Sequence, residues 1–135
     1  MGRHMQAQGL LPDLALVSAS ARTRETVALL MAQWPAPAPL DIQRGLYLAE
    51  APAMLEAIRA APPQTRMLML VGHNPGMADL AFNLTVGGDP QARARMMEGF
   101  PTCALAVLEV SCSWEDLTFQ GARLTDFITP DHLDA

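Results

Sequence analysis

The stretch "RMLMLVGHNPGMADLAFNL", residues 66–84, joins a short apolar run to a polar turn and then to a helical pattern. The apolar run ends at Gly72 and predicts a strand buried on both faces, as in a parallel sheet. The helix that follows carries one apolar face, made by Met77, Leu80, Ala81 and Leu84. His73 lies at the junction. Taken alone, it is also explained as a half-buried histidine bonded to a nearby carbonyl, with no chemical role.

The turn itself carries the signals of a helix start. Asn74 is a good N-cap residue and Pro75 suits the first helical position, while Gly72 permits a close backbone approach. His73 is therefore expected just ahead of a helix N-terminus, which favours negative charge.

A second strand-to-helix turn has the same character. "LALVS", residues 14–18, predicts another buried strand, and the helical pattern that follows spaces Ser18, Arg22 and Thr26 four residues apart. Arg22 falls in the first helical turn, where free backbone N–H groups favour an anion and a cation is a poor partner. A bound anion would explain the arginine; the alternative is that Arg22 and Arg24 are both solvated surface residues.

The rest of the chain alternates helices and strands. Helices are expected before Gly9, over residues 20–34 and over residues 51–60. The second of these carries Val27 and Trp34 on its apolar face. "PAPAP" is an extended connector, and after "GGDP" strands are expected at residues 103–110, 117–119 and 122–127. The pattern predicts one α/β domain over residues 1–135, with three layers and a mostly parallel sheet that has helices on both faces.

Composition narrows the classes of function. Half of the 135 residues are apolar and the net charge is −5 without a Lys/Arg run, which argues against a nucleic-acid binder. Cys103 and Cys112 are expected to be free thiols in a reducing compartment, not metal ligands. No apolar run approaches the ~20 residues that span a bilayer, and no signal peptide is visible, so a cytoplasmic protein without membrane contact is expected.

Three motifs together resemble the histidine phosphatase superfamily, and most closely its small bacterial SixA-type phosphohistidine phosphatases. They are "LVSASARTRET", "LMLVGHNPGMADLA" and "FPTCALAVLEV", and the similarity runs from about Gly9 to Pro130. The resemblance implies a phosphoglycerate mutase-like fold and a metal-free, cofactor-free phosphoryl-transfer site. In that family one histidine attacks phosphorus and is transiently phosphorylated, while a second histidine and arginines hold the phosphoryl oxygens.

The resemblance assigns roles to individual residues. Arg22 matches the arginine of the phosphate cradle, and His73 matches the second histidine, which suits a reaction driven by positioning and charge stabilisation. Three further residues lie where they could orient these groups: Ser18, Asn74 and Thr102. Glu50 is the candidate for an acid that protonates the leaving group.

The attacking histidine of the family is expected on a strand that ends in R-H-G or R-H-A, and no such strand is found. "GRHM", residues 2–5, follows nothing apolar and lies too close to residues 14–18 for a parallel crossover. The sequence therefore predicts an N-terminally truncated domain that lacks its first strand. Two open strand edges would result, which favours a homo-oligomer with shared or swapped strands.

Two functions remain open at this level. One is a phosphatase that hydrolyses a phosphohistidine or other phosphomonoester, on a phosphorylated protein or a small molecule, with this chain alone nearly inactive. The other is a non-catalytic module that binds phosphate or a phosphopeptide.

Overall fold

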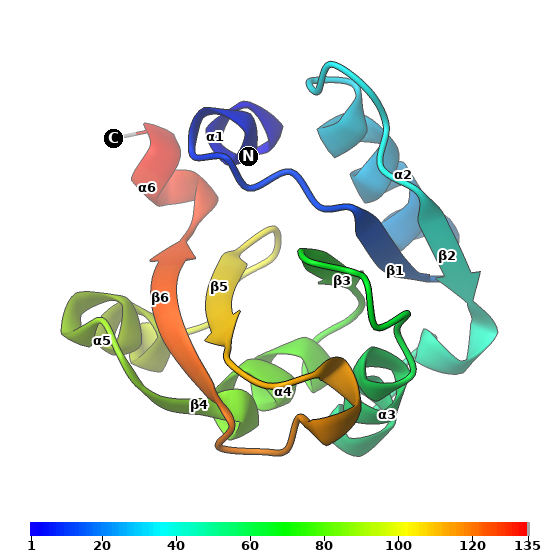
Figure 1. Cartoon of the computed structure of the whole chain (residues 1–135). Helices are drawn as coiled ribbons and strands as arrows, with labels where there is room; N and C mark the ends of the chain where they lie inside the picture. The colour runs from blue at the N-terminus through cyan, green and yellow to red at the C-terminus, as the bar shows by residue number, and fades with distance from the viewer. Residues whose placement is uncertain (135) are drawn as a thin grey trace.

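The strands form two separate three-stranded sheets in the computed structural model, which describes residues 1–134 (Figure 1). The first sheet has the order β2-β1-β3 and is parallel throughout; its strands are β1 (Leu14–Ser18), β2 (Leu40–Gln43) and β3 (Leu68–Val71). The second has the order β4-β6-β5, with strands β4 (Thr85–Gly88), β5 (Leu105–Val110) and β6 (Ala122–Ile128). β4 and β6 are parallel and β5 is antiparallel to β6, so the predicted mostly parallel α/β fold is confirmed.

Helices cover both sheets. The α-helices are α1 (Gly2–Ala7), α2 (Ala21–Met31), α3 (Ala51–Arg59), α4 (Gly76–Leu84), α5 (Pro90–Glu98) and α6 (Pro130–Asp134), with 3-10 turns η1 (Arg44–Leu46) and η2 (Trp114–Asp116). The helices predicted over residues 20–34 and 51–60 and after Asn74 are present as α2, α3 and α4, but α2 ends at Met31, so that Trp34 lies beyond it. Within the described residues, no helix has the length and apolar character needed to cross a bilayer.

β1 is the best-buried strand of the first sheet because helices cover both of its faces and a strand pairs with each of its edges. Ala15 and Val17 pack against Val27 of α2, whereas Leu16 faces the other way and joins a cluster with Met54 of α3 and Leu80 of α4. Successive side chains of a strand point to opposite faces, so an uninterrupted apolar run is what such a strand requires.

Asp13 fastens the amino ends of β1 and β3 to each other. Its carboxylate accepts hydrogen bonds from the backbone N–H groups of Arg66 (2.9 Å) and Met67 (2.7 Å), and its own N–H donates to the carbonyl of Met67. The bond from Arg66 is the main cause that lowers the pKa of Asp13 below its ordinary value. This clamp fixes the register in which Val17 and Val71 end side by side.

Some expectations about single elements are wrong. All four residues of β3 are only half-buried, because β3 pairs with β1 on one edge and with no strand on the other among the described residues. Residues 117–119 are not a strand; Leu117 follows the 3-10 turn η2 and is buried in the core. Helix α4 begins at Gly76, one residue later than predicted, so that Pro75 and not Asn74 precedes its first turn.

Two other expectations are confirmed. "GRHM" lies within α1, so His4 is on a helix and not at the end of a strand. Met5 of that helix packs with Trp34, which follows the last turn of α2, and this places α1 at the opposite end of α2 from Arg22. Cys103 and Cys112 are exposed and free.

Candidate functional site

The two turns meet through a hydrogen bond between Ser18 and His73. Ser18 is the last residue of β1 and its side chain is completely buried, with its Oγ 3.0 Å from Nε2 of His73. His73 follows the end of the neighbouring parallel strand β3 by two residues. Residues that the sequence separates by 55 positions are therefore in direct contact at the carboxyl edge of the sheet.

Helix α2 begins at Ala21, three residues after Ser18, and hydroxyl groups fix its position. The Ser20 side chain accepts the backbone N–H of Thr23 as the N-cap, and the buried Thr23 hydroxyl donates to the carbonyl of Ser18 at 2.7 Å. Arg22 is the second residue of this helix and its side chain is exposed. Within residues 1–134 its guanidinium has neither an ion-pair nor a hydrogen-bond partner, which leaves its donors free for an anion.

Asn74 ties the His73 turn to the loop that contains Thr102. Its Nδ2 donates to the carbonyl of Phe100 at 2.9 Å, and its Oδ1 accepts from the N–H of Ala78 in α4 at 3.2 Å. The Asn74–Pro75 peptide bond is cis. Thr102 lies two residues beyond Phe100, exposed in a turn, and no hydrogen bond joins it to His73 among the described residues.

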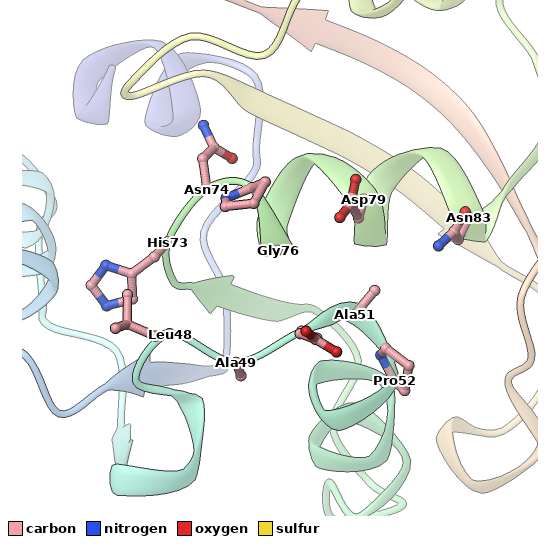
Figure 2. Close-up of a pocket in the computed structure, with 11 residues that line it drawn as sticks. Leu48, Ala49, Ala51, Pro52, His73, Asn74, Gly76, Asp79 and Asn83 are labelled. Atoms are coloured by element: carbon pink, nitrogen blue, oxygen red, sulfur yellow. The ribbon is translucent and has the colours of Figure 1, made fainter.

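A cavity of about 500 Å³ adjoins His73 (Figure 2). One wall is the start of α3 with the segment before it, including Glu50, and the other is α4 with Asp79 and Asn83. Figure 2 shows His73 at one end, beside Leu48, with Asp79 and Asn83 further along α4. Glu50, the predicted acid, is the residue before α3; it is exposed and lines this same cavity.

Gly76 allows the two walls of the cavity to approach. A Cβ at this position would collide with the carbonyl oxygen of Ala49 and would lie 2.9 Å from the Met54 side chain. The first turn of α4 therefore lies directly against the backbone that leads to Glu50, and a larger residue would push the two helices apart.

Three residues at this site were not predicted from the sequence. Tyr47 contacts the His73 ring edge to face, with centroids 5.5 Å apart and an interplanar angle of 80°. No local pattern marks Tyr47, because it reaches the site through the 3-10 turn η1 that precedes it. Asp79 and Asn83 could have been found, since they are four residues apart on the side of α4 that does not carry its apolar stripe.

The architecture is thus that of an α/β protein whose parallel strands end together at one edge, the edge at which such proteins bind their ligands. Solved structures with a similar fold identify the family within this class of α/β proteins. One is the crystal structure of the "putative phosphohistidine phosphatase SixA" from Agrobacterium tumefaciens. It is 30% identical to this chain in sequence and superposes with a TM-score of 0.74, over 96% of this chain and 75% of that chain. The chain belongs to the SixA phosphohistidine phosphatases, a branch of the histidine phosphatase superfamily.

Two further solved structures share the fold, and one curated protein is similar in sequence. The structure of the "Putative Phosphohistidine Phosphatase SixA" from Nakamurella multipartitia has a TM-score of 0.80 at 24% identity, over 96% of this chain and 77% of that one. A protein histidine phosphatase SixA complexed with tungstate has a TM-score of 0.76 at 16% identity, over 98% and 78%. An uncharacterised protein of Mycobacterium tuberculosis is 32% identical over 120 residues, 87% of this chain and 73% of its own length. No family model matches the chain.

Proposed function

We propose that this chain binds the phosphoryl group of a phosphohistidine, or of another phosphomonoester, at the carboxyl edge of β1 and β3. The contact between Ser18 and His73 carries this proposal, because it joins two turns that are each suited to an anion into one site. The membership of the SixA family supports it.

The geometry suggests a role for each residue. Since Ser18 pairs with Nε2 of His73, a phosphoryl oxygen would be bound through Nδ1. Arg22 supplies a guanidinium from the first turn of α2, whose backbone N–H groups add to the attraction. Asn74 holds the His73 turn in place, and Thr102 supplies a hydroxyl from the loop that Asn74 anchors.

Glu50 is suited to serve the leaving group. Hydrolysis of a phosphohistidine breaks the P–N bond, and the departing imidazole nitrogen must gain a proton. Glu50 lines the cavity that opens beside His73, so a leaving group held in that cavity would lie between the two side chains. Because Glu50 is exposed, a phosphorylated side chain on a partner protein could reach it as well as a small phosphomonoester could.

The attack on phosphorus requires a second imidazole in this mechanism. His4 lies in α1, at the far end of α2 from Arg22, and His132 lies in α6. We therefore expect the 135-residue chain to bind phosphate analogues while hydrolysing phosphohistidine very slowly. A homo-oligomer with shared or swapped strands remains a prediction, which sedimentation velocity tests.

Titration with tungstate, followed by calorimetry, tests the proposed site. Arg22→Ala and His73→Ala should each weaken binding about tenfold or more, since each removes a charge-assisted hydrogen bond. Arg24→Ala and His132→Ala are the matched controls, because Arg24 lies two residues beyond Arg22, on another face of α2, and His132 lies in α6. Equal losses in Arg24→Ala and Arg22→Ala would refute the site.

A non-catalytic phosphate-binding module is the second candidate, favoured by the single histidine that the described residues bring to this edge. Hydrolysis of a small phosphoramidate distinguishes the two functions. Binding without turnover supports the module, whereas turnover that disappears in His73→Ala supports a complete enzyme.

A further inference from the structure

The third strand of the first sheet also ends at the edge where Ser18 and His73 meet. β2 runs parallel to β1, with Gln43 and Ser18 as Cα partners, and the backbone N–H of Ala19 donates to the carbonyl of Gln43 at 3.1 Å. Arg44 is the first residue after β2 and begins the turn η1. Because all three strands are parallel, Arg44 lies at the same carboxyl edge as the proposed phosphate site.

Arg44 and Tyr47 lie on the same side of η1. Residues three positions apart are eclipsed in a 3-10 turn, and the backbone N–H of Tyr47 donates to the carbonyl of Arg44 at 3.1 Å. The Tyr47 ring contacts the His73 ring, with centroids 5.5 Å apart, whereas Leu46 points into the core. Leu48, the residue after Tyr47, also lies beside His73 (Figure 2). The side of η1 that carries Arg44 is therefore the side that faces His73.

Arg22 and Arg44 reach this edge from opposite faces of the sheet. Arg22 belongs to α2, which covers one face of β1 through Val27. η1 lies on the other face, because its Leu46 clusters with Leu16, the β1 side chain that points away from α2. The two arginines therefore flank the carboxyl end of β1 from both faces.

The donors of Arg44 are free. Arg44 is exposed, and within residues 1–134 its guanidinium makes neither an ion pair nor a hydrogen bond. Asp41, the nearest carboxylate along the chain, accepts instead from the side-chain amide of Gln43 at 2.9 Å. Two cations at the ends of adjacent strands repel each other, whereas an anion between them attracts both. A guanidinium also has the planar fork of donors that matches phosphate oxygens.

We propose that Arg44 is a second guanidinium of the phosphate site and binds the phosphoryl group together with Arg22 and His73. The inference rests on the proposed function and adds a residue to it. The two arginines hold phosphoryl oxygens from the two faces of the sheet, while the rest of the substrate extends into the cavity that Glu50 lines. Arg44 does not line that cavity, so its guanidinium serves the phosphoryl group and not the leaving group.

Calorimetric titration of the full chain with tungstate tests the role of Arg44. Arg44→Ala should weaken tungstate binding about fivefold or more, since it removes charge-assisted hydrogen bonds. Arg93→Ala is the matched control and should leave the affinity unchanged, because Arg93 is exposed on α5, which packs against β6 of the second sheet. An unchanged affinity in Arg44→Ala, or equal losses in the two variants, would overturn the proposal.

Salt separates a direct contact from the effect of a remote charge. In about 0.5 M sodium chloride, exposed charges are screened over a few ångströms. If Arg44 contacts the anion, Arg44→Ala should still bind tungstate more weakly than the parent chain under these conditions. A loss that disappears in salt would show that Arg44 acts only through its distant charge, and would overturn the contact.

The same titrations distinguish failure of this inference from failure of the proposed function. A parent chain that binds no tungstate would overturn both. Loss of affinity in Arg22→Ala and His73→Ala, with full affinity in Arg44→Ala, would leave the phosphate site standing and overturn the role of Arg44 alone.

Discussion

β1 and β3 lie side by side in one sheet, have equally apolar sequences, and differ sharply in burial. In β1, Ala15, Leu16 and Val17 are at most 1% exposed, whereas every residue of β3 is half-buried. The difference comes from their edges, since β1 is paired on both sides and β3 on one. An apolar run therefore indicates that helices cover a strand's two faces, but it does not indicate whether its edges are covered.

The same pair of strands also carries the candidate site. Each strand ends in a polar turn whose role the sequence left open. Arg22 could equally be a solvated surface residue, and His73 a half-buried histidine without a chemical role. The contact between Ser18 and His73 is the observation that brings the two turns together.

The largest predicted effect is on stability and bears directly on the two strands. Leu16→Ala should lower the free energy of unfolding by about 3 kcal/mol, because it leaves a cavity among side chains that cannot collapse. Leu70→Ala in β3 should cost about half as much, since this leucine lies on an edge strand and is only half-buried. Urea denaturation of both variants measures the difference. Equal losses would show that β3 is as well packed as β1.

The sequence predicts those parts of the fold and site that depend on neighbouring residues, and not those that depend on contacts between distant residues. The strand at residues 14–18 and the helices α2, α3 and α4 were predicted because periodic apolar residues determine them locally. β2 was missed because it is a short edge strand with exposed side chains, and α5 because few of its residues are apolar. Pairing of edges, and the approach of Tyr47 to His73, depend on residues far apart in the chain and leave no local pattern.

Ser18→Ala tests the contact between the strand ends and should have the next largest effect. Loss of this partly buried hydrogen bond, worth about 1 kcal/mol, should weaken tungstate binding about fivefold, since the His73 ring loses the partner that orients it. Ser113→Ala, which removes the N-cap hydroxyl of η2, is the matched control and should leave tungstate affinity unchanged. Calorimetric titration of the two variants makes the comparison, and an unchanged affinity in Ser18→Ala would contradict the role given to this serine.

The smallest predicted effect concerns the clamp at the amino ends of β1 and β3. The pKa of Asp13 is lower in the folded chain than in the unfolded chain, so its charged form stabilises the fold. This contribution is present above the unfolded pKa and is lost as the pH falls through the folded value. Asp13→Asn should therefore be less stable than the parent chain at pH 7, by a margin that narrows below about pH 4. Thermal unfolding between pH 3 and pH 7 follows the margin; a margin that does not change with pH would contradict the clamp.

The central claim is that the turns after β1 and β3 form one phosphate site. A double-mutant cycle on Arg22 and His73, with tungstate affinity measured by calorimetry, tests it most directly. If both side chains hold one anion, each single alanine variant removes most of the binding, and the double variant binds only slightly more weakly than either. If the two losses simply add, to within about 0.5 kcal/mol, the turns act independently and the claim is contradicted.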